Sequence, residues 1–307
     1  MSFQDKIVII TGASSGIGAL MAHMFAERGA VPVLAARSET KLAEAAARIR
    51  GPHGTYALDV TSAEQVEDVM GRILREYGRI DILINNAGYG VFDSFVNAPL
   101  REFENMMDVN YMGTVRCTKA VLPSMLKRGN GHIVNIASMA GKIGSAKSSG
   151  YSATKHAVLG LTNCLRQELV GSGVSLTAVN PGPIDTPFFD IADPSGSYVK
   201  NVKWFMLKPE QVAERVLQAI ERRTPEVNLP FTAAAGVKLY QLFPRLFDRI
   251  GYKLLNKKIN GGHPSVCLLA SFSFWFRLRT SSYSARMSAL LSGWFWFQWL
   301  ASAGIVL

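Results

Sequence analysis

The chain has 307 residues, of which 48% are hydrophobic, and its mean hydropathy is +0.13. This length and composition allow one large α/β domain or two small ones with a sizeable core. The net charge of +10 makes nucleic acid and anionic membranes candidate partners. However, no basic run exceeds Lys257-Lys258 and no nucleic-acid motif occurs. We therefore expect an anionic cofactor and no nucleic acid.

The first apolar run is followed by a glycine-rich turn. Ile7–Ile10 is short and continuously apolar, which is typical of a buried strand in a parallel sheet. Gly12, Gly16 and Gly18 then open a helical pattern that extends through Arg28. Glycines here allow a tight turn and let backbone N–H groups approach a pyrophosphate at a helix N-terminus. The turn predicts a dinucleotide site, with Gly-x-x-x-Gly-x-Gly in place of the more usual Gly-x-Gly-x-x-Gly.

The second predicted strand, Val31–Ala35, ends beside a basic residue. An acidic side chain after this strand would bind the ribose 2′-hydroxyl of NAD. Here Ala36 and Arg37 follow instead, and the planar guanidinium of Arg37 suits a 2′-phosphate. The sequence therefore favours NADP(H) over NAD(H), and a solvated arginine at a strand end is the alternative.

Strands and helical patterns alternate over the first 230 residues. The further predicted strands are 55–60, 80–84, 133–137, 174–179 and 227–229, and the further predicted helices are 41–50, 61–77, 101–126, one that carries Tyr151, and 209–222. This alternation predicts an α/β protein with one Rossmann-type doubly wound parallel sheet in a single domain, followed by a C-terminal apolar extension.

Polar residues follow several predicted strands. Asn85-Asn86-Ala87-Gly88 carries two amides that could tie neighbouring strands together and meet a flat ligand, although a plain turn explains these residues equally well. Asn110 lies inside a predicted helix, where an asparagine competes for backbone hydrogen bonds and is expected to disturb the helix locally. Later, Pro181 and Pro183 fix the backbone, and Thr186 is placed to hydrogen-bond a cofactor amide.

A serine, a tyrosine and a lysine form the candidate reaction centre. Ser138 follows the strand 133–137, so its hydroxyl is expected at the carboxyl edge of the sheet, where ligands bind. Tyr151 and Lys155 leave one face of a helix, and an ammonium near the phenol would lower its pKa from about 10. This arrangement predicts proton transfer to a carbonyl, whereas Tyr-x-x-x-Lys alone would also fit an ordinary surface helix.

The segments after the last common strands are apolar or basic. Residues 187–207 are irregular and contain Phe188, Phe189 and Trp204, which suits a lid over an apolar substrate. Residues 231–258 are amphipathic and basic, as expected of an interfacial helix or a flap over the substrate mouth.

The tail, residues 259–307, changes abruptly in composition. It is rich in Trp, Phe and Ser, and the run from Met287 to Leu307 has no charge and is long enough to span a bilayer. An anchor is one interpretation, and a tail that is not an evolved part of the fold is the one we favour.

The cellular compartment is suggested by the cysteines. There are three, widely spaced, which argues against a disulfide framework or a metal site and for a reducing compartment. Only Met1–Lys6 precede the first apolar run, so we expect no signal peptide. The expected location is cytoplasmic, with membrane-surface contact through residues 231–307 as the alternative.

Taken together, these motifs resemble those of the short-chain dehydrogenase/reductase family. The matching residues are Thr11–Gly18, Asn85–Gly88, Asn110, Ser138, Tyr151 with Lys155, and Pro181-Gly182 with Thr186. The resemblance covers about residues 3–230 and implies an enzyme that interconverts a small-molecule carbonyl and a secondary alcohol with NADP(H). It also implies a homodimer or homotetramer. The alternatives are a membrane-associated reductase of lipid-like carbonyls and a non-catalytic NADPH sensor on the same fold.

The resemblance also implies a role for each matching residue. Tyr151 would be the general acid or base, Lys155 would lower its pKa, Ser138 would polarise the carbonyl, and Asn110 would hold a water in a proton relay. The residues implied in holding the cofactor are Gly12, Ser14, Ser15, Gly16, Ile17, Gly18, Arg37, Asp59, Val60, Asn86, Ala87, Gly88, Tyr151, Lys155, Pro181, Gly182, Ile184 and Thr186. No metal ligands are implied.

Overall fold

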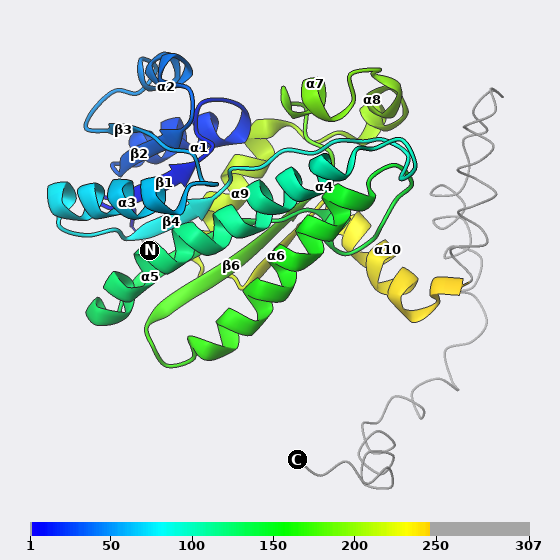
Figure 1. Ribbon diagram of the computed structural model, residues 1–307. Coiled ribbons are helices and arrows are strands. Elements are labelled where there is room, and N and C mark those ends of the chain that lie inside the picture. The colour runs from blue at the N-terminus through cyan, green and yellow to red at the C-terminus, as the bar shows by residue number, and fades with distance from the viewer. Residues whose placement is uncertain (1, 246–307) are drawn as a thin grey trace, which may run out of the picture. The chain divides into compact units, whose positions relative to one another are not determined.

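A computed structural model describes residues 2–245 of the protein (Figure 1). The strands are β1 Ile7–Thr11, β2 Val31–Ala36, β3 Gly54–Ala57, β4 Ile82–Asn85, β5 Gly131–Ile136, β6 Val174–Pro181 and β7 Glu226–Leu229. The helices are α1 Gly16–Glu27, α2 Glu39–Ala46, α3 Ala63–Tyr77, α4 Leu100–Met107, α5 Gly113–Arg128, α6 Ser149–Glu168, α7 Phe188–Ala192, α8 Ser197–Val202, α9 Pro209–Glu221 and α10 Phe231–Leu242.

The strands form one 7-stranded sheet with the order β3-β2-β1-β4-β5-β6-β7. All neighbouring strands are parallel, so their carboxyl ends meet at one edge. The order reverses between β1 and β4, and in open sheets of this kind the crevice beyond that point is where ligands bind. The predicted doubly wound parallel sheet is thus confirmed.

Alternate residues of each central strand enter separate cores on the two faces of the sheet. Val8 and Ile10 of β1 pack in a cluster with α1 and α9, whereas Ile7 and Ile9 pack in a cluster with α3 and α5. Figure 1 shows α3, α5 and α6 in front of the sheet, with α1 and α9 behind it. Because both faces are covered, the strands read as continuous apolar runs in the sequence.

The helix predicted over 101–126 is interrupted where Asn110 lies. The chain forms α4, then a π-helical turn over Asp108–Met112, then α5. A π turn widens the helix by one residue and is frequent at functional sites. The predicted local disturbance at Asn110 is confirmed, and it takes this specific form.

The segment 187–207 is more ordered than predicted, because it contains α7, α8 and a 3-10 turn over Lys203–Phe205. Its two ends are tied together: the N–H of Asp185 donates to the carbonyl of Leu207 at 3.0 Å, and the N–H of Leu207 donates to the carbonyl of Pro183 at 2.8 Å. This flap, residues 183–207, is therefore a closed loop that carries its own short helices.

The compact unit that contains the sheet extends to Leu242 and includes α10, which buries Val237. Residues 243–307 form a second unit, of which only 243–245 are described. Most of the predicted basic segment beyond α10, and the whole tail 259–307, lie outside the described residues. Within residues 2–245, no helix combines the length and the apolar character that crossing a bilayer requires.

Candidate active site

The glycine-rich turn and the Asn86-Ala87 segment fit closely together at the carboxyl ends of β1 and β4. Gly12 has φ +65°, and a Cβ atom there would lie 2.8 Å from the Ala87 Cα. A Cβ atom at Gly18 would lie 2.5 Å from the Gly12 carbonyl oxygen. The Asn86 side-chain amide donates to the carbonyls of Thr11 and Gly12 at 2.9 and 3.2 Å. Larger residues are therefore excluded at both glycines.

The N-terminus of α1 is open for an anionic group. Its N-cap residue, Ser15, makes no side-chain cap, and the first turn has no acidic residue. Gly16 has φ +55°, and a Cβ atom there would face Thr186 at 3.8 Å. The uncapped N–H groups of this helix end carry a partial positive charge. The turn therefore has the form of a phosphate-binding site, bounded by Thr186 on the far side.

The other predicted cofactor residues line the same edge. Arg37 is exposed directly after β2, and its charge lowers the pKa of Tyr89, although burial raises that pKa overall. The Asp59 carboxylate accepts hydrogen bonds from the N–H and hydroxyl of Thr61 at 2.9 and 2.8 Å. Val60 is buried, and its side chain would lie 2.7 Å from a Cβ atom at Gly113, the first residue of α5.

Amide side chains join the strands below this edge. The Asn85 amide donates to Asn135 of β5 at 2.8 Å and to Thr118 of α5 at 3.1 Å, and the Asn135 amide donates to Thr162 of α6 at 2.9 Å. The expectation that the asparagines tie neighbouring strands together is confirmed. The network explains why polar side chains are tolerated between two apolar cores.

Ser138 lies where β5 and β6 end. Its hydroxyl donates to the carbonyl of Pro181 at 3.3 Å and accepts from the N–H of Ala140 at 3.1 Å. Gly182 continues the same connection, since its N–H donates to the carbonyl of Leu229 at 2.7 Å. The hydroxyl of Ser138 is thereby fixed at the carboxyl edge of the sheet, as predicted.

Tyr151 and Lys155 point from α6 toward this edge. Lys155 is buried, its Nζ donates to the carbonyl of Ile136 at 2.8 Å, and this atom lies 5.7 Å from the centre of the Tyr151 ring. Burial lowers the pKa of Lys155 to about 8. The predicted contact between the lysine and the phenol ring is therefore present.

The expected lowering of the Tyr151 pKa is not what the structure gives. Burial raises the pKa of Tyr151 to about 12, and a hydrogen bond with Ser138 offsets only part of this rise. The physical reason is that desolvation disfavours the phenolate, while the hydrogen bond of the Lys155 ammonium goes to the carbonyl of Ile136. A phenol in this environment is protonated at neutral pH.

Asn110 holds the loop that follows β4. Its side-chain oxygen accepts from the N–H of Tyr89 at 2.9 Å, and its amide donates to the carbonyl of Tyr89 at 2.9 Å and to the hydroxyl of Thr154 at 3.0 Å. Gly88 makes this approach feasible, because a Cβ atom there would lie 2.9 Å from the Asn110 side-chain oxygen and 3.6 Å from Lys155 Nζ. Asn110 thus fixes the distance between this loop and α6.

Aromatic rings surround the phenol of Tyr151. Phe92 has its ring centre 5.9 Å from that of Tyr151 and 4.9 Å from that of Tyr198, and Phe188 lies 5.6 Å from Tyr151. We call Phe92, Phe188 and Tyr198 the aromatic wall. Phe188 is recognisable from the sequence, but Phe92 and Tyr198 are not, because these two residues belong to segments without a recognisable motif.

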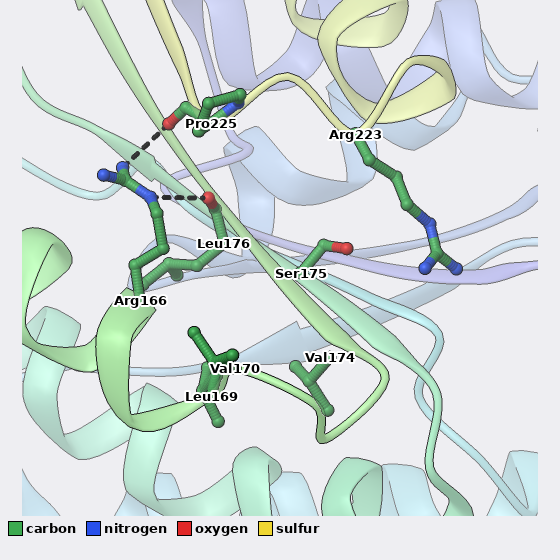
Figure 2. Close-up of a pocket in the computed structure, with 8 residues that line it drawn as sticks. All are labelled: Arg166, Leu169, Val170, Val174, Ser175, Leu176, Arg223 and Pro225. Carbon is green, nitrogen blue, oxygen red and sulfur yellow. Dashed lines mark hydrogen bonds between the residues drawn. The ribbon is translucent and has the colours of Figure 1, made fainter.

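A separate pocket of about 200 Å³ lies at the opposite, amino-terminal end of β6 (Figure 2). There Arg166 donates to the carbonyls of Leu176 and Pro225 at 3.4 and 2.8 Å. Arg223 also lines the pocket, with its guanidinium turned away from Arg166. The arginine bonds hold the start of the β7 connection against β6. None of the predicted site residues lines this pocket.

Comparison with known proteins agrees with this geometry. The family model for the short chain dehydrogenase matches residues 6–194. An oxidoreductase from Staphylococcus saprophyticus is 39% identical over 226 residues, which cover 72% of this chain and 94% of that protein.

Two solved structures share the fold. A short chain dehydrogenase/reductase from Burkholderia phymatum, in complex with NAD, has a TM-score of 0.74 and 27% identity, covering 80% of this chain and 96% of that one. A variant actinorhodin polyketide ketoreductase with NADPH has a TM-score of 0.67 and 30% identity, covering 73% and 95%. The family match spans more than half of the chain, and the chain belongs to the short-chain dehydrogenase/reductase family of oxidoreductases.

Proposed function

We propose that the protein is an NADP(H)-dependent oxidoreductase that interconverts a carbonyl compound and a secondary alcohol, with Tyr151 as the general acid or base. The observation that carries this proposal is the meeting of Ser138, Tyr151 and Lys155 at the sheet edge that also holds the glycine-rich turn. Few arrangements other than carbonyl reduction use a protonated phenol beside a fixed hydroxyl and a nucleotide site.

The turn and its neighbours fit a nicotinamide dinucleotide. Gly16 leaves room for a pyrophosphate at the uncapped N-terminus of α1, while Thr186 lies across from Gly16 for a carboxamide. Lys155 lies within reach of a ribose at the same edge. When bound, the nicotinamide supplies or accepts the hydride, which no side chain can do.

Residues of the chain would donate the proton to the substrate oxygen or accept it from there. Tyr151 has a pKa of about 12, so its phenol is protonated at neutral pH and can donate to a carbonyl oxygen as hydride arrives. The hydroxyl of Ser138 would donate to the same oxygen by turning its proton away from the carbonyl of Pro181. In the direction of alcohol oxidation, Tyr151 must instead accept the proton, and any additional positive charge beside it would lower its pKa and favour that direction.

Arg37 supports NADP(H) over NAD(H). It is exposed directly after β2, and no acidic residue occupies the positions next to it. Its fork of N–H groups matches a phosphate on the ribose, whereas it offers no acceptor for a ribose hydroxyl.

The aromatic wall supports an apolar substrate. Phe92 packs edge-on against Tyr151 and Phe188 packs against it at a tilt, and the flap 183–207 carries Phe188. Since apolar surface beside a proton donor favours ligands that bury carbon, we infer that the flap acts as the lid over such a substrate.

The proposal is tested by binding and turnover on the purified protein. We expect NADPH to bind more tightly than NADH, and NADPH to be oxidised when a panel of ketones and aldehydes is added. Tyr151→Phe should lower turnover by on the order of 100-fold or more, as expected for the loss of a general acid, and should change the NADPH dissociation constant little.

Tyr77→Phe is the matched control, because Tyr77 lies at the end of α3 and outside the candidate site. It should turn over at the rate of the unmodified chain. Turnover by Tyr151→Phe at the unmodified rate would contradict the assignment of Tyr151.

A further inference from the structure

The aromatic wall packs on a buried ring, and its own three rings remain partly exposed. Phe189 is buried and stacks on Tyr198, with ring centres 5.7 Å apart, and it also lies 6.2 Å from Phe92. Phe92, Phe188 and Tyr198 are each only half-buried. One buried ring thus carries three rings that keep part of their apolar surface free beside Tyr151. Such a surface suits a flat ring or a conjugated group, which packs edge-on or offset against aromatic side chains.

Tyr198 adds a polar atom to this apolar surface. Its hydroxyl forms no hydrogen bond with any residue in the described range 2–245, and burial together with the charge of Asp193 raises its pKa. It therefore keeps its proton and is available as a donor. A half-buried hydroxyl without a protein acceptor is expected to find one in a ligand or in water.

The position of Tyr198 is fixed from its own helix. The Asp193 carboxylate accepts from the N–H of Val199 at 3.0 Å and from the hydroxyl of Ser195 at 2.8 Å. The flap is also joined to the loop after β4, because the N–H of Phe92 donates to the carbonyl of Ala192 at 2.9 Å. Tyr198 and Phe92 are thus held against each other from two separate segments.

The ring of Phe92 contacts the rings of two phenols, Tyr151 and Tyr198. We propose that Tyr198 is a specificity-determining residue that donates a hydrogen bond to a second oxygen of an aromatic or conjugated carbonyl substrate. The ring of that substrate would pack on Phe92 while its carbonyl faces Tyr151 and Ser138. This inference rests on the proposed function and names the substrate class for the same site.

The arrangement limits the distance between the two oxygens of the substrate. Because Tyr151 and Tyr198 both contact the Phe92 ring, with ring centres 5.9 and 4.9 Å from it, a ligand that reaches both phenols should carry its second oxygen within about one aromatic ring of the carbonyl. Hydroxyacetophenones have this form, acetophenone lacks the second oxygen, and 2-butanone lacks the ring. These compounds separate the contribution of the hydrogen bond from that of the ring.

The test compares kcat/KM for these compounds at saturating cofactor. The protein should prefer one hydroxyacetophenone isomer over acetophenone by about 5-fold, as expected for one hydrogen bond, and Tyr198→Phe should bring this ratio close to 1. Phe92→Leu should lower the ratio of acetophenone to 2-butanone by about 5-fold. Phe95→Leu is the matched control, since Phe95 lies on the same loop but is 74% exposed, and it should change neither ratio.

Two results would overturn the inference: equal kcat/KM for 2-butanone and acetophenone, or an isomer preference that persists in Tyr198→Phe. If no carbonyl is reduced at all, the proposed function fails, and calorimetry of the same compounds on the cofactor-loaded protein decides the inference separately. The inference would be supported if one hydroxyacetophenone isomer binds and its binding is weaker in Tyr198→Phe. Equal binding of all the compounds, or binding of none, would contradict it.

Discussion

At the scale of single residues, two opposing effects act on the charges of the site. Desolvation disfavours both the phenolate of Tyr151 and the ammonium of Lys155, so the pKa of the first rises to about 12 and that of the second falls to about 8. Their mutual attraction is small in comparison because the Lys155 ammonium is bound to a backbone carbonyl. The pKa values of the two groups, which are ordinarily close to each other, therefore move apart, and such perturbed values are common where protons are transferred.

Arg37 is the residue on which the cofactor preference depends. Arg37→Ala should weaken NADPH binding by roughly 10- to 100-fold, the size expected for a charge-assisted hydrogen bond to phosphate, and NADH binding by far less. Fluorescence titration with each cofactor measures both constants. Arg48→Ala, an exposed arginine after α2, is the control. Equal losses for NADPH and NADH would mean that Arg37 is merely solvated.

Asn110 is a structural residue as well as a candidate catalytic one. Asn110→Ala removes three hydrogen bonds and leaves the N–H and carbonyl of Tyr89 without their partner. We expect a loss of about 3 kcal/mol in the free energy of unfolding, measured by urea denaturation. Asn163→Ala, at an exposed position of α6, should cost less than about 0.5 kcal/mol. Similar losses for the two variants would contradict this role of Asn110.

At the scale of elements, the flap depends on a few local contacts. Its ends are tied at Asp185 and Leu207, and α8 is held by the buried carboxylate of Asp193. Hydrogen bonds from Ser195 and from backbone N–H groups lower the pKa of Asp193 in spite of its burial. Trp204 on the same segment is 72% exposed. The flap is thus locally ordered, with less apolar burial than the sheet and its helices.

Asp193→Ala should therefore act on the substrate and not on the cofactor. With the acceptor for the N–H of Val199 and the hydroxyl of Ser195 removed, Tyr198 is no longer fixed, and we expect KM for an aryl ketone to rise about 10-fold, a loss of about 1.4 kcal/mol, while the NADPH dissociation constant stays the same. Asp190→Ala, an exposed position of α7, is the matched control. Steady-state kinetics and NADPH titration distinguish the two effects, and a parallel loss of cofactor affinity would argue against a separate flap.

At the scale of the whole molecule, a buried histidine in the sheet is expected to make the free energy of unfolding depend on pH. His132 of β5 donates from Nε2 to the hydroxyl oxygen of Thr177 at 2.8 Å, because the proton of Thr177 is itself donated to the carbonyl of Thr224. The Nδ1 atom has no partner among the described residues. Burial, followed by the charge of Arg223, lowers the pKa of His132 to about 4. The folded protein therefore keeps this imidazole neutral.

Stability should consequently fall as the pH falls below the ordinary histidine pKa of about 6.5. In this range the unfolded chain binds a proton at His132 and the folded chain does not, so the free energy of unfolding should drop by about 2 kcal/mol from pH 7 to pH 5. Carboxylates with lowered pKa values, such as Glu214, remain ionised in this range. Urea denaturation at several pH values measures the slope.

His132→Gln keeps an amide donor for Thr177 and removes the titration, so this part of the slope should disappear. His53→Gln, at an exposed position, should leave it in place. An unchanged slope in His132→Gln would show that other groups cause the pH dependence.

The sequence by itself determined the architecture and most of the site, because both depend on local patterns. Continuous apolar runs such as Ile7–Ile10 mark strands that are buried on both faces. Since parallel strands end at one edge, residues that follow them, such as Ser138 and Asn86, were expected to meet there. The spacing of Tyr151 and Lys155 on one helix placed both side chains on one face.

Only the tertiary structure decided what surrounds these residues. The rise in the Tyr151 pKa, the bonds of Asn110 to Tyr89 and the aromatic wall all arise between segments that are distant in the sequence. Desolvation depends on the atoms packed around a group, and ring contacts depend on how a loop and a flap come together. Neither leaves a periodic signal along the chain, so Phe92 and Tyr198 became visible only in the folded protein.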